Sequence, residues 1–188
     1  TVLCWGNISG GKTAAIEGTF VQVSAGAFHT CGVKSDGTIA CWGKNFFGSM
    51  NYPAGTFNQV SVGYMHTCGI QSDGTLDCWG LNENNQIDFP SGTFTQISAG
   101  LFHNCAVRSD GTVACWGSVT EETTPSDILF GQLISAGGEH TCEIRKDGTL
   151  ACWGRDDDGQ STPPEGLYHQ LSAGGGFNCG IKSDCLLY

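Results

Sequence analysis

The sequence lacks several features that would point to common functional classes. Only 8 of its 188 residues are Lys or Arg, against 18 Asp and Glu, so the formal net charge is −10. Such a surface repels phosphate backbones, and we expect no nucleic-acid partner. No run approaches the ~18 consecutive apolar residues of a membrane-spanning helix, so we expect no membrane insertion either.

Catalytic and cofactor motifs are missing from the sequence as well. It has no GxSxG elbow, no HExxH pair and no phosphate-cradling loop. We therefore expect no enzyme and no cofactor, and no metal site, because paired CxxC motifs are absent. Two metal alternatives stay open. One uses His29 with Cys31 and Cys41, and the other binds calcium at the acidic stretch RDDDGQ, residues 155–160.

Glycine and cysteine are abundant, and they follow a repeat. The 29 Gly suggest many turns and short strands, and the 11 Cys suggest disulfides formed outside the cytosol. HTCGVKSDGTIACWG at 29–43 recurs as HTCGIQSDGTLDCWG at 66–80, and equivalent positions step by 37 residues without a gap. The single domain, 1–188, divides into repeats of about 18–54, 55–91, 92–128, 129–165, and 166–188 joined with 1–17.

Each repeat predicts short strands and one tight hairpin. CGV and TIACWG flank KSDG, in which Gly37 takes the left-handed position of a bulged turn. This register makes Cys31 and Cys41 cross-strand neighbours with Cβ atoms ~4.5–5.5 Å apart, close to disulfide distance. A loop and a short outer strand are expected before the next repeat. The pattern predicts an all-β fold, a five-bladed β-propeller.

The cysteines predict one disulfide per blade. TVLCWG at 1–6 matches the end of a repeat, whereas FNCGIKSD at 177–184 matches the start of a hairpin. We expect N- and C-terminal strands to share the last blade and close the ring; the alternative bond, Cys179–Cys185, would leave Cys4 free. Cys185 has no equivalent in other repeats, so we expect a free or intermolecular thiol there. The predicted pairs are Cys31–Cys41, Cys68–Cys78, Cys105–Cys115, Cys142–Cys152 and Cys4–Cys179.

Other repeated side chains are expected to build the scaffold. One position of the repeat, or column, holds histidine in four units and Phe177 in the fifth. This exchange favours a packing role with one buried hydrogen bond over a symmetric ring of catalytic or metal-binding histidines. Tryptophan fills its column in every repeat, which favours packing between blades over sugar stacking. The hairpin aspartates are expected to bond their own backbone. The columns are His29, His66, His103 and His140; Trp5, Trp42, Trp79, Trp116 and Trp153; and Asp36, Asp73, Asp110, Asp147 and Asp184.

Function is expected in the loops that vary between repeats. The first such loop contains Phe46, Phe47, Met50 and Tyr52, which form either a contact patch or a cover over their own blade. Asn7-Ile8-Ser9 is an N-glycosylation sequon, meaningful in a secretory eukaryote.

The repeat VSAGAFHTCGVKSDGTIACWG resembles those of the regulator-of-chromosome-condensation family. WGRDDDGQSTPPEG at 153–166 is similar to the blade linkers of secreted bacterial propellers of that type. The resemblance covers all five units and implies a β-propeller, a fold that carries many functions. This chain has five units where seven is the family's usual number.

These features together predict a non-enzymatic structural or protein-interaction module, located outside the cell or at its surface. The expected partners are other protein chains, including copies of itself in a surface or matrix filament. One alternative is a multivalent carbohydrate-binding lectin, which makes glycans a second expected ligand class. The other is a protein inhibitor that docks through one propeller face.

Overall fold

The chain folds into a row of small antiparallel sheets. The computed structural model describes residues 2, 4, 16–119 and 131–183. Within them lie four three-stranded sheets and one two-stranded sheet, each made of consecutive strands. The strands are β1 (Phe20–Ala25), β2 (His29–Lys34), β3 (Ile39–Gly43), β4 (Phe57–Val62), β5 (His66–Gln71), β6 (Leu76–Gly80), β7 (Phe94–Ala99), β8 (His103–Arg108), β9 (Val113–Gly117), β10 (Gly131–Ala136), β11 (His140–Arg145), β12 (Leu150–Gly154), β13 (Tyr168–Ala173) and β14 (Asn178–Lys182).

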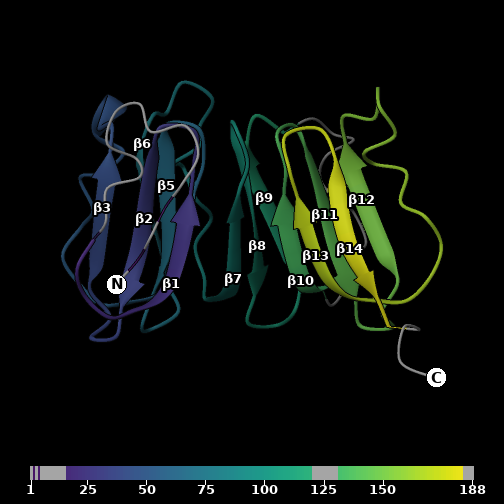
Figure 1. Ribbon diagram of the computed structural model, residues 1–188, viewed down its shortest axis with the longest axis horizontal. Helices are drawn as coiled ribbons and strands as arrows, with labels where there is room; N and C mark the ends of the chain where they lie inside the picture. The colour runs from purple at the N-terminus through teal and green to yellow at the C-terminus, as the bar shows by residue number, and fades with distance from the viewer. Residues whose placement is uncertain (1, 3, 5–15, 120–130, 184–188) are drawn as a thin grey trace.

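The sheets follow one another in chain order, as in a β-propeller; β1 of the first sheet and β13 of the last both lie toward the middle of the view, with β7 and β8 between them in the picture (Figure 1). Their first strands end around a shared hollow lined by small residues from every sheet. Glycine is required there because a Cβ on Gly63 would lie 2.6 Å from the carbonyl oxygen of Gly100, and a Cβ on Gly100 would lie 2.5 Å from that of Gly137. The glycine column thus lets neighbouring sheets approach closely.

The hairpin chemistry follows the sequence closely. Asp36 Oδ1 accepts hydrogen bonds from the backbone N–H (2.9 Å) and the hydroxyl (2.7 Å) of Thr38. These bonds hold the pKa of Asp36 below its usual value. Gly37 has φ 83°, the left-handed conformation predicted for it, and Cys31 pairs directly with Cys41. The same turn recurs at Asp73, Asp110 and Asp147.

The hydrophobic core lies between the sheets rather than within any one of them. Cys31, Val33 and Ile39 of the first sheet pack against Val60 and its neighbours in the second. Trp79 of the second sheet closes this junction, as predicted for the tryptophan column, and donates its indole N–H to the carbonyl oxygen of Ser49 (2.8 Å). Trp116 and Trp153 close the next two junctions. An interior sheet therefore packs on both of its faces, and an end sheet leaves one apolar face in water.

Polar side chains also link each sheet to the next. Gln22 donates to the carbonyl oxygen of Val60 (2.8 Å) and accepts from its N–H (3.0 Å), while Ser24 Oγ accepts from the N–H of Val62. A β-bulge between Phe20 and Gln22 precedes these residues in β1. The histidines do the same in the interior: each Nε2 lies within 2.7–2.9 Å of a hydroxyl or amide oxygen in the following sheet. These pairs are His29–Thr67, His66–Asn104, His103–Thr141 and His140–Asn178.

Four disulfides join the second and third strands of the three-stranded sheets: Cys31–Cys41, Cys68–Cys78, Cys105–Cys115 and Cys142–Cys152. Both cysteines of the predicted Cys4–Cys179 bond are free in the structure. Val2 bridges Ile16, just ahead of β1, and Cys179 lies in β14. The bond itself stays a prediction.

One further expectation differs from the structure, and ring closure stays a prediction. The loop at 44–54 forms no outer strand; it contains the short 3-10 turn η2 (Phe46–Gly48) instead. Ring closure is not seen among the described residues, and the two end sheets leave apolar side chains in water. Val23 is 42% exposed, whereas its equivalent Val60 is 1% exposed. At the other end Ile181 is 48% exposed, against 3% for Ile144.

Candidate functional site

The predicted contact loop belongs to a larger aromatic surface, which we call the rim patch. It consists of Phe28, Phe46, Phe47, Tyr64 and Phe102. Edge-to-face contacts connect four of these rings in a row, with centroid distances of 5.2 Å from Phe46 to Phe28, 5.1 Å from Phe28 to Tyr64 and 5.4 Å from Tyr64 to Phe102. The row therefore crosses the first three sheets.

The loop that carries the patch is held by its own polar groups. Asn45 Oδ1 accepts the N–H of Met50 (2.8 Å), and the Asn45 amide donates to Asn51. Phe47 has φ 53°, a left-handed conformation that is unusual for a bulky residue, and its side chain is 62% exposed. Tyr52 is exposed and Met50 is half-buried. The loop thus presents aromatic surface to solvent rather than covering its own sheet.

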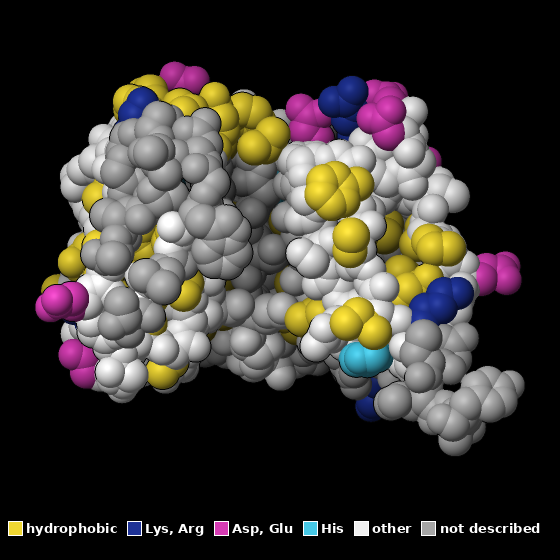
Figure 2. Space-filling view, in the orientation of Figure 1, with side chains coloured by type: hydrophobic (Ala, Val, Ile, Leu, Met, Phe, Trp, Pro, Cys, Tyr) yellow, Lys and Arg dark blue, Asp and Glu magenta, His cyan; other side chains and the backbone are white. Residues whose placement is uncertain are grey.

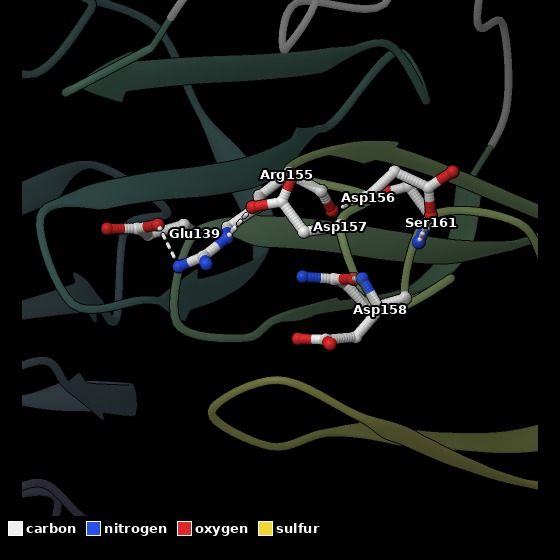
Figure 3. A network of polar contacts seen from close by, with 7 residues as sticks. Glu139, Arg155, Asp156, Asp157, Asp158 and Ser161 are labelled. Atoms are coloured by element: carbon white, nitrogen blue, oxygen red, sulfur yellow. Dashed lines mark hydrogen bonds and ion pairs between the residues drawn. The ribbon is translucent and has the colours of Figure 1, made fainter.

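The same rim becomes charged at the fourth sheet. The Arg155 guanidinium contacts Asp157 Oδ2 (2.7 Å) and Glu139 Oε2 (3.1 Å), as Figure 3 shows. Glu139 stands at the repeat position of Phe28 and Phe102. In Figure 2 apolar side chains gather along the upper left edge and charged ones along the upper right. The rim therefore has an apolar half and an ionic half.

The acidic stretch considered for calcium has a local structural role. Asp156 Oδ1 accepts the N–H of Ser161 (2.7 Å), and Asp156 Oδ2 accepts the hydroxyl of Thr162 (2.7 Å). Asp156 occupies the repeat position of Asn45 and organises its loop in the same way. In the part of the chain that the structure describes, no group of three or more His, Cys, Asp or Glu side chains could hold a metal ion.

Sequence reasoning missed one buried ionisable group. Glu143 in β11 is fully buried, neither carboxylate oxygen has a hydrogen-bond partner, and Arg145 Nε lies 3.9 Å from Oε1. Burial raises the pKa of Glu143 to about 7, against the smaller opposing effect of Arg145. Equivalent positions hold Gly32 and Gly69, over which phenylalanine rings pack closely. An acid at a position filled elsewhere by glycine or alanine is the feature of the sequence that could have identified it.

Sequence reasoning also missed most of the rim patch. Phe28 and Phe102 directly precede the buried histidines, and Tyr64 lies two residues before His66. The feature of the sequence that could have identified Phe28 and Phe102 is their shared repeat position, which is apolar in three repeats and is Glu139 in the fourth. Of the other predicted sites, Asn7 and Cys185 lie outside the described residues.

Comparison with known sequences places this scaffold in a family. The profile of the "Regulator of chromosome condensation (RCC1) repeat" matches residues 20–49, 57–86, 94–118 and 132–160, more than half of the chain. The chain belongs to the RCC1-repeat family. Each matched segment runs from the first strand of one sheet past its third strand, so the RCC1 repeat coincides with the structural unit described above.

Solved structures give the same assignment of fold. The CRINKLY WD40 ectodomain of the Arabidopsis thaliana receptor kinase ACR4 is 26% identical with a TM-score of 0.78, and the match covers 96% of this chain and 68% of that one. The ectodomain of the Physcomitrella patens receptor kinase CR4 is 25% identical with a TM-score of 0.83, and the match covers 99% of this chain and 54% of that one. Prp20p of Saccharomyces cerevisiae, studied for its binding to Gsp1p and histones, is 17% identical with a TM-score of 0.75. That match covers 91% of this chain and 58% of Prp20p. The chain thus spans between about half and two thirds of the length of these relatives.

Comparison with curated protein sequences gave no significant match. Among the described residues, no helix has the length and apolar character needed to cross a membrane.

Proposed function

We propose that the chain is a non-enzymatic, extracellular protein-interaction module that assembles with copies of itself into a surface or matrix filament. The observation that carries the proposal is the exposed apolar face at each end of the row of sheets. Val23 lies on one face and Ile181 on the other. The two faces are complementary, because every interior junction joins one face of each kind.

An extracellular location is supported by two observations. Four disulfides stabilise the described sheets, and such bonds persist in oxidising compartments. The similar structures at 25–26% identity are ectodomains of receptor kinases.

The two end faces can meet within one chain or between chains. The first arrangement closes the five-bladed ring that the sequence predicts. The second is a head-to-tail contact, which generates an open filament when its rotation does not close. We favour the second because Val23 and Ile181 on the two end faces are both exposed, as a contact between chains requires.

Light scattering after size-exclusion chromatography tests the proposed function. The wild-type protein should grow in mass as its concentration rises, and Val23→Asp and Ile181→Asp should each hold it at the monomer mass, since a buried charge in the new junction is costly. Phe47→Asp is the control, because Phe47 is also an exposed apolar residue but lies on the rim patch; it should assemble as the wild type does. A wild type that is monomeric at every concentration overturns the proposal, and so does unchanged assembly of the end variants.

A second candidate function is docking of a different protein through the rim patch, and the row of contacting aromatic rings favours it. Aromatic anchors with a charged margin are typical of protein interfaces. In this case cross-links in native material should map to Phe28, Phe46 and Phe47, and the double variant Phe46→Ala, Phe47→Ala should abolish them. The matched control is Glu83→Ala, Asn84→Ala, the equivalent positions of the second repeat.

A further inference from the structure

The apolar half and the ionic half of the rim form one continuous surface. Phe102 ends the row of contacting rings, and Glu139 stands at the same repeat position in the next sheet. The two turns touch, because the N–H of Leu101 donates to the carbonyl oxygen of Gly138 (3.2 Å). A partner that lies along the row of rings therefore also reaches the carboxylate of Glu139.

The loop at the apolar end of this surface is fixed to the second sheet. It contains Ser49, which is fully buried. The carbonyl oxygen of Ser49 accepts the hydroxyl of Thr67 (2.9 Å) and the indole N–H of Trp79 (2.8 Å). A surface that is held in place before binding loses little conformational entropy when a partner docks on it.

Phe47 in this loop has a backbone conformation that its equivalents avoid. Its φ is 53°, whereas Asn84 and Asp158, at the same position of the second and fourth repeats, have no positive φ. Such a conformation is unfavourable for a bulky residue, and residues of this kind cluster at ligand-binding sites. Here it accompanies a ring that is 62% exposed, so the loop presents an apolar side chain to a partner instead of to the core.

The ionic half carries more negative than positive charge. The carboxylates of Glu139 and Asp157 share the guanidinium of Arg155, as Figure 3 shows. Glu139 is 52% exposed and Asp157 71% exposed, and the neighbouring Asp158 is exposed as well. A partner that covers this half removes water from the carboxylates, which is costly unless the partner supplies a cation.

The other described charges of the rim have mostly the same sign. In the loop segments 44–52, 81–89 and 155–161, exposed acidic side chains outnumber basic ones. Beyond the residues just named, the acids are Glu83, Asp88 and Asp156, and the base is Lys44. Lys44 Nζ lies 5.6 Å from the centre of the Phe46 ring, so this ring already has a cation over it. The rim thus combines exposed aromatic rings with an excess of acid.

We propose that the rim binds an extended segment of a different protein, which places large apolar side chains on the rim patch and an arginine or lysine on the ionic half. The proposal rests on the docking function given above as the second candidate, and it names the chemistry of the partner. An extended segment fits because the row of rings crosses the turns of three sheets and continues to the fourth. Arginine suits the site best, because its guanidinium pairs with carboxylates and also stacks on aromatic rings.

The same charges disfavour other partners. An acidic segment or a nucleic acid is repelled by the rim. A wholly apolar segment would leave Glu139 and Asp157 without water and without a sufficient counter-charge. The combination of apolar and basic side chains is therefore the chemistry that satisfies both halves.

A random peptide library displayed on phage tests the proposal. The immobilised protein should enrich peptides that combine aromatic or long aliphatic residues with Arg or Lys. A synthetic copy of an enriched peptide should bind the double variant Phe46→Ala, Phe47→Ala at least about tenfold more weakly, as measured by fluorescence anisotropy. Leu167→Ala is the control, because Leu167 is 49% exposed but lies beside the hairpin turn that contains Gly148; it should bind as the wild type does.

The same peptide tests the contribution of charge. The double variant Glu139→Gln, Asp157→Asn should bind it about fivefold more weakly at low salt and with less dependence on salt. Glu165→Gln removes an exposed negative charge outside these rim segments and should change neither quantity. Asp157→Lys should weaken binding as well, and a peptide with its Arg replaced by Glu should recover it. A merely structural role of Asp157 would give no such recovery.

Two kinds of failure are distinguishable. Enriched peptides that depend on Phe46 and Phe47 but contain no basic residue, or that bind the charge variants as tightly as the wild type, overturn the assignment of the partner and leave docking through the rim patch in place. A selection that gives no peptide dependent on Phe46 and Phe47 overturns both this inference and the docking function. Self-assembly through the end faces is tested separately by light scattering.

Discussion

The interior junctions and the two ends of this molecule carry nearly the same residues in different surroundings. Val60 is buried by the sheet before it, whereas Val23, its equivalent, has no preceding sheet among the described residues and is exposed. His66 bonds to Asn104 of the next sheet, whereas Phe177 at the same position is 64% exposed. The comparison teaches that the repeated residues form the contact with the next sheet as well as the sheet itself. A sheet without a neighbour therefore exposes apolar surface that is buried elsewhere.

The largest expected difference between the interior junctions and the ends is in the pH dependence of the free energy of unfolding. Burial lowers the pKa of His29 and of His103 to about 4, with a smaller effect of neighbouring histidines, and it also lowers that of His66. The unfolded chain binds these protons near pH 6.5, so stability is fully present above that pH and falls as the pH drops toward 4. His29 and His103 can each contribute up to about 3 kcal/mol.

Glu143 acts in the opposite direction. Its pKa is raised to about 7, so the folded state holds the proton more tightly and stability falls as the pH rises from about 4.5 to 7. Urea unfolding between pH 4 and pH 8 should therefore show stability that rises with pH, and more steeply in Glu143→Gln. A profile that is flat in both proteins would contradict the burial of the histidine column.

The next-largest difference in stability between the interior junctions and the ends should come from removing an aromatic side chain. Trp79→Ala empties a buried junction and leaves the Ser49 carbonyl without its indole donor, so we expect a loss of about 3–5 kcal/mol. Phe177→Ala removes an exposed ring at the end and should change stability by less than about 0.5 kcal/mol. Urea denaturation of dilute protein measures both, and comparable losses would show that the last sheet is covered in solution.

The smallest and cleanest contrast uses one residue type at one repeat position. Val60→Ala should destabilise the dilute protein by about 1.5–3 kcal/mol, because the side chain is almost fully buried. Val23→Ala should cost less than half as much at the same concentration. When the protein is concentrated enough to assemble, the cost of Val23→Ala should rise toward that of Val60→Ala, as thermal unfolding at several concentrations would reveal.

Local chemistry was predictable from the sequence, but long-range arrangement was not. The KSDG turns, the paired cysteines of the hairpins and the buried histidines depend on neighbours within one repeat or on a strict repeat column. Closure of the ring depends on curvature, which is set by how neighbouring sheets pack and leaves no local pattern. The bond between Cys4 and Cys179, which depends on that closure, therefore stays a prediction, and both cysteines are free in the structure.

The rim patch shows the same limit. Phe46 and Phe47 stood out as apolar residues in a loop. Phe46 contacts Phe28, which in turn contacts Tyr64, and these two residues come from turns of two different sheets. Only the side-by-side stacking of sheets brings these turns together. Glu143 escaped notice for a related reason, since its burial depends on packing and not on its neighbours in sequence.

Hydrogen–deuterium exchange at low and high protein concentration would test the central claim most directly. In dilute protein the amides of β14 should exchange much faster than those of β11, and those of β1 faster than those of β4, because the end sheets lack a neighbour. Concentrating the protein should protect β14 and β1 together and leave the loop of Phe46 and Phe47 unchanged. Protection of β14 equal to that of β11 in a dilute monomer would contradict the account, because it would mean that the chain closes on itself.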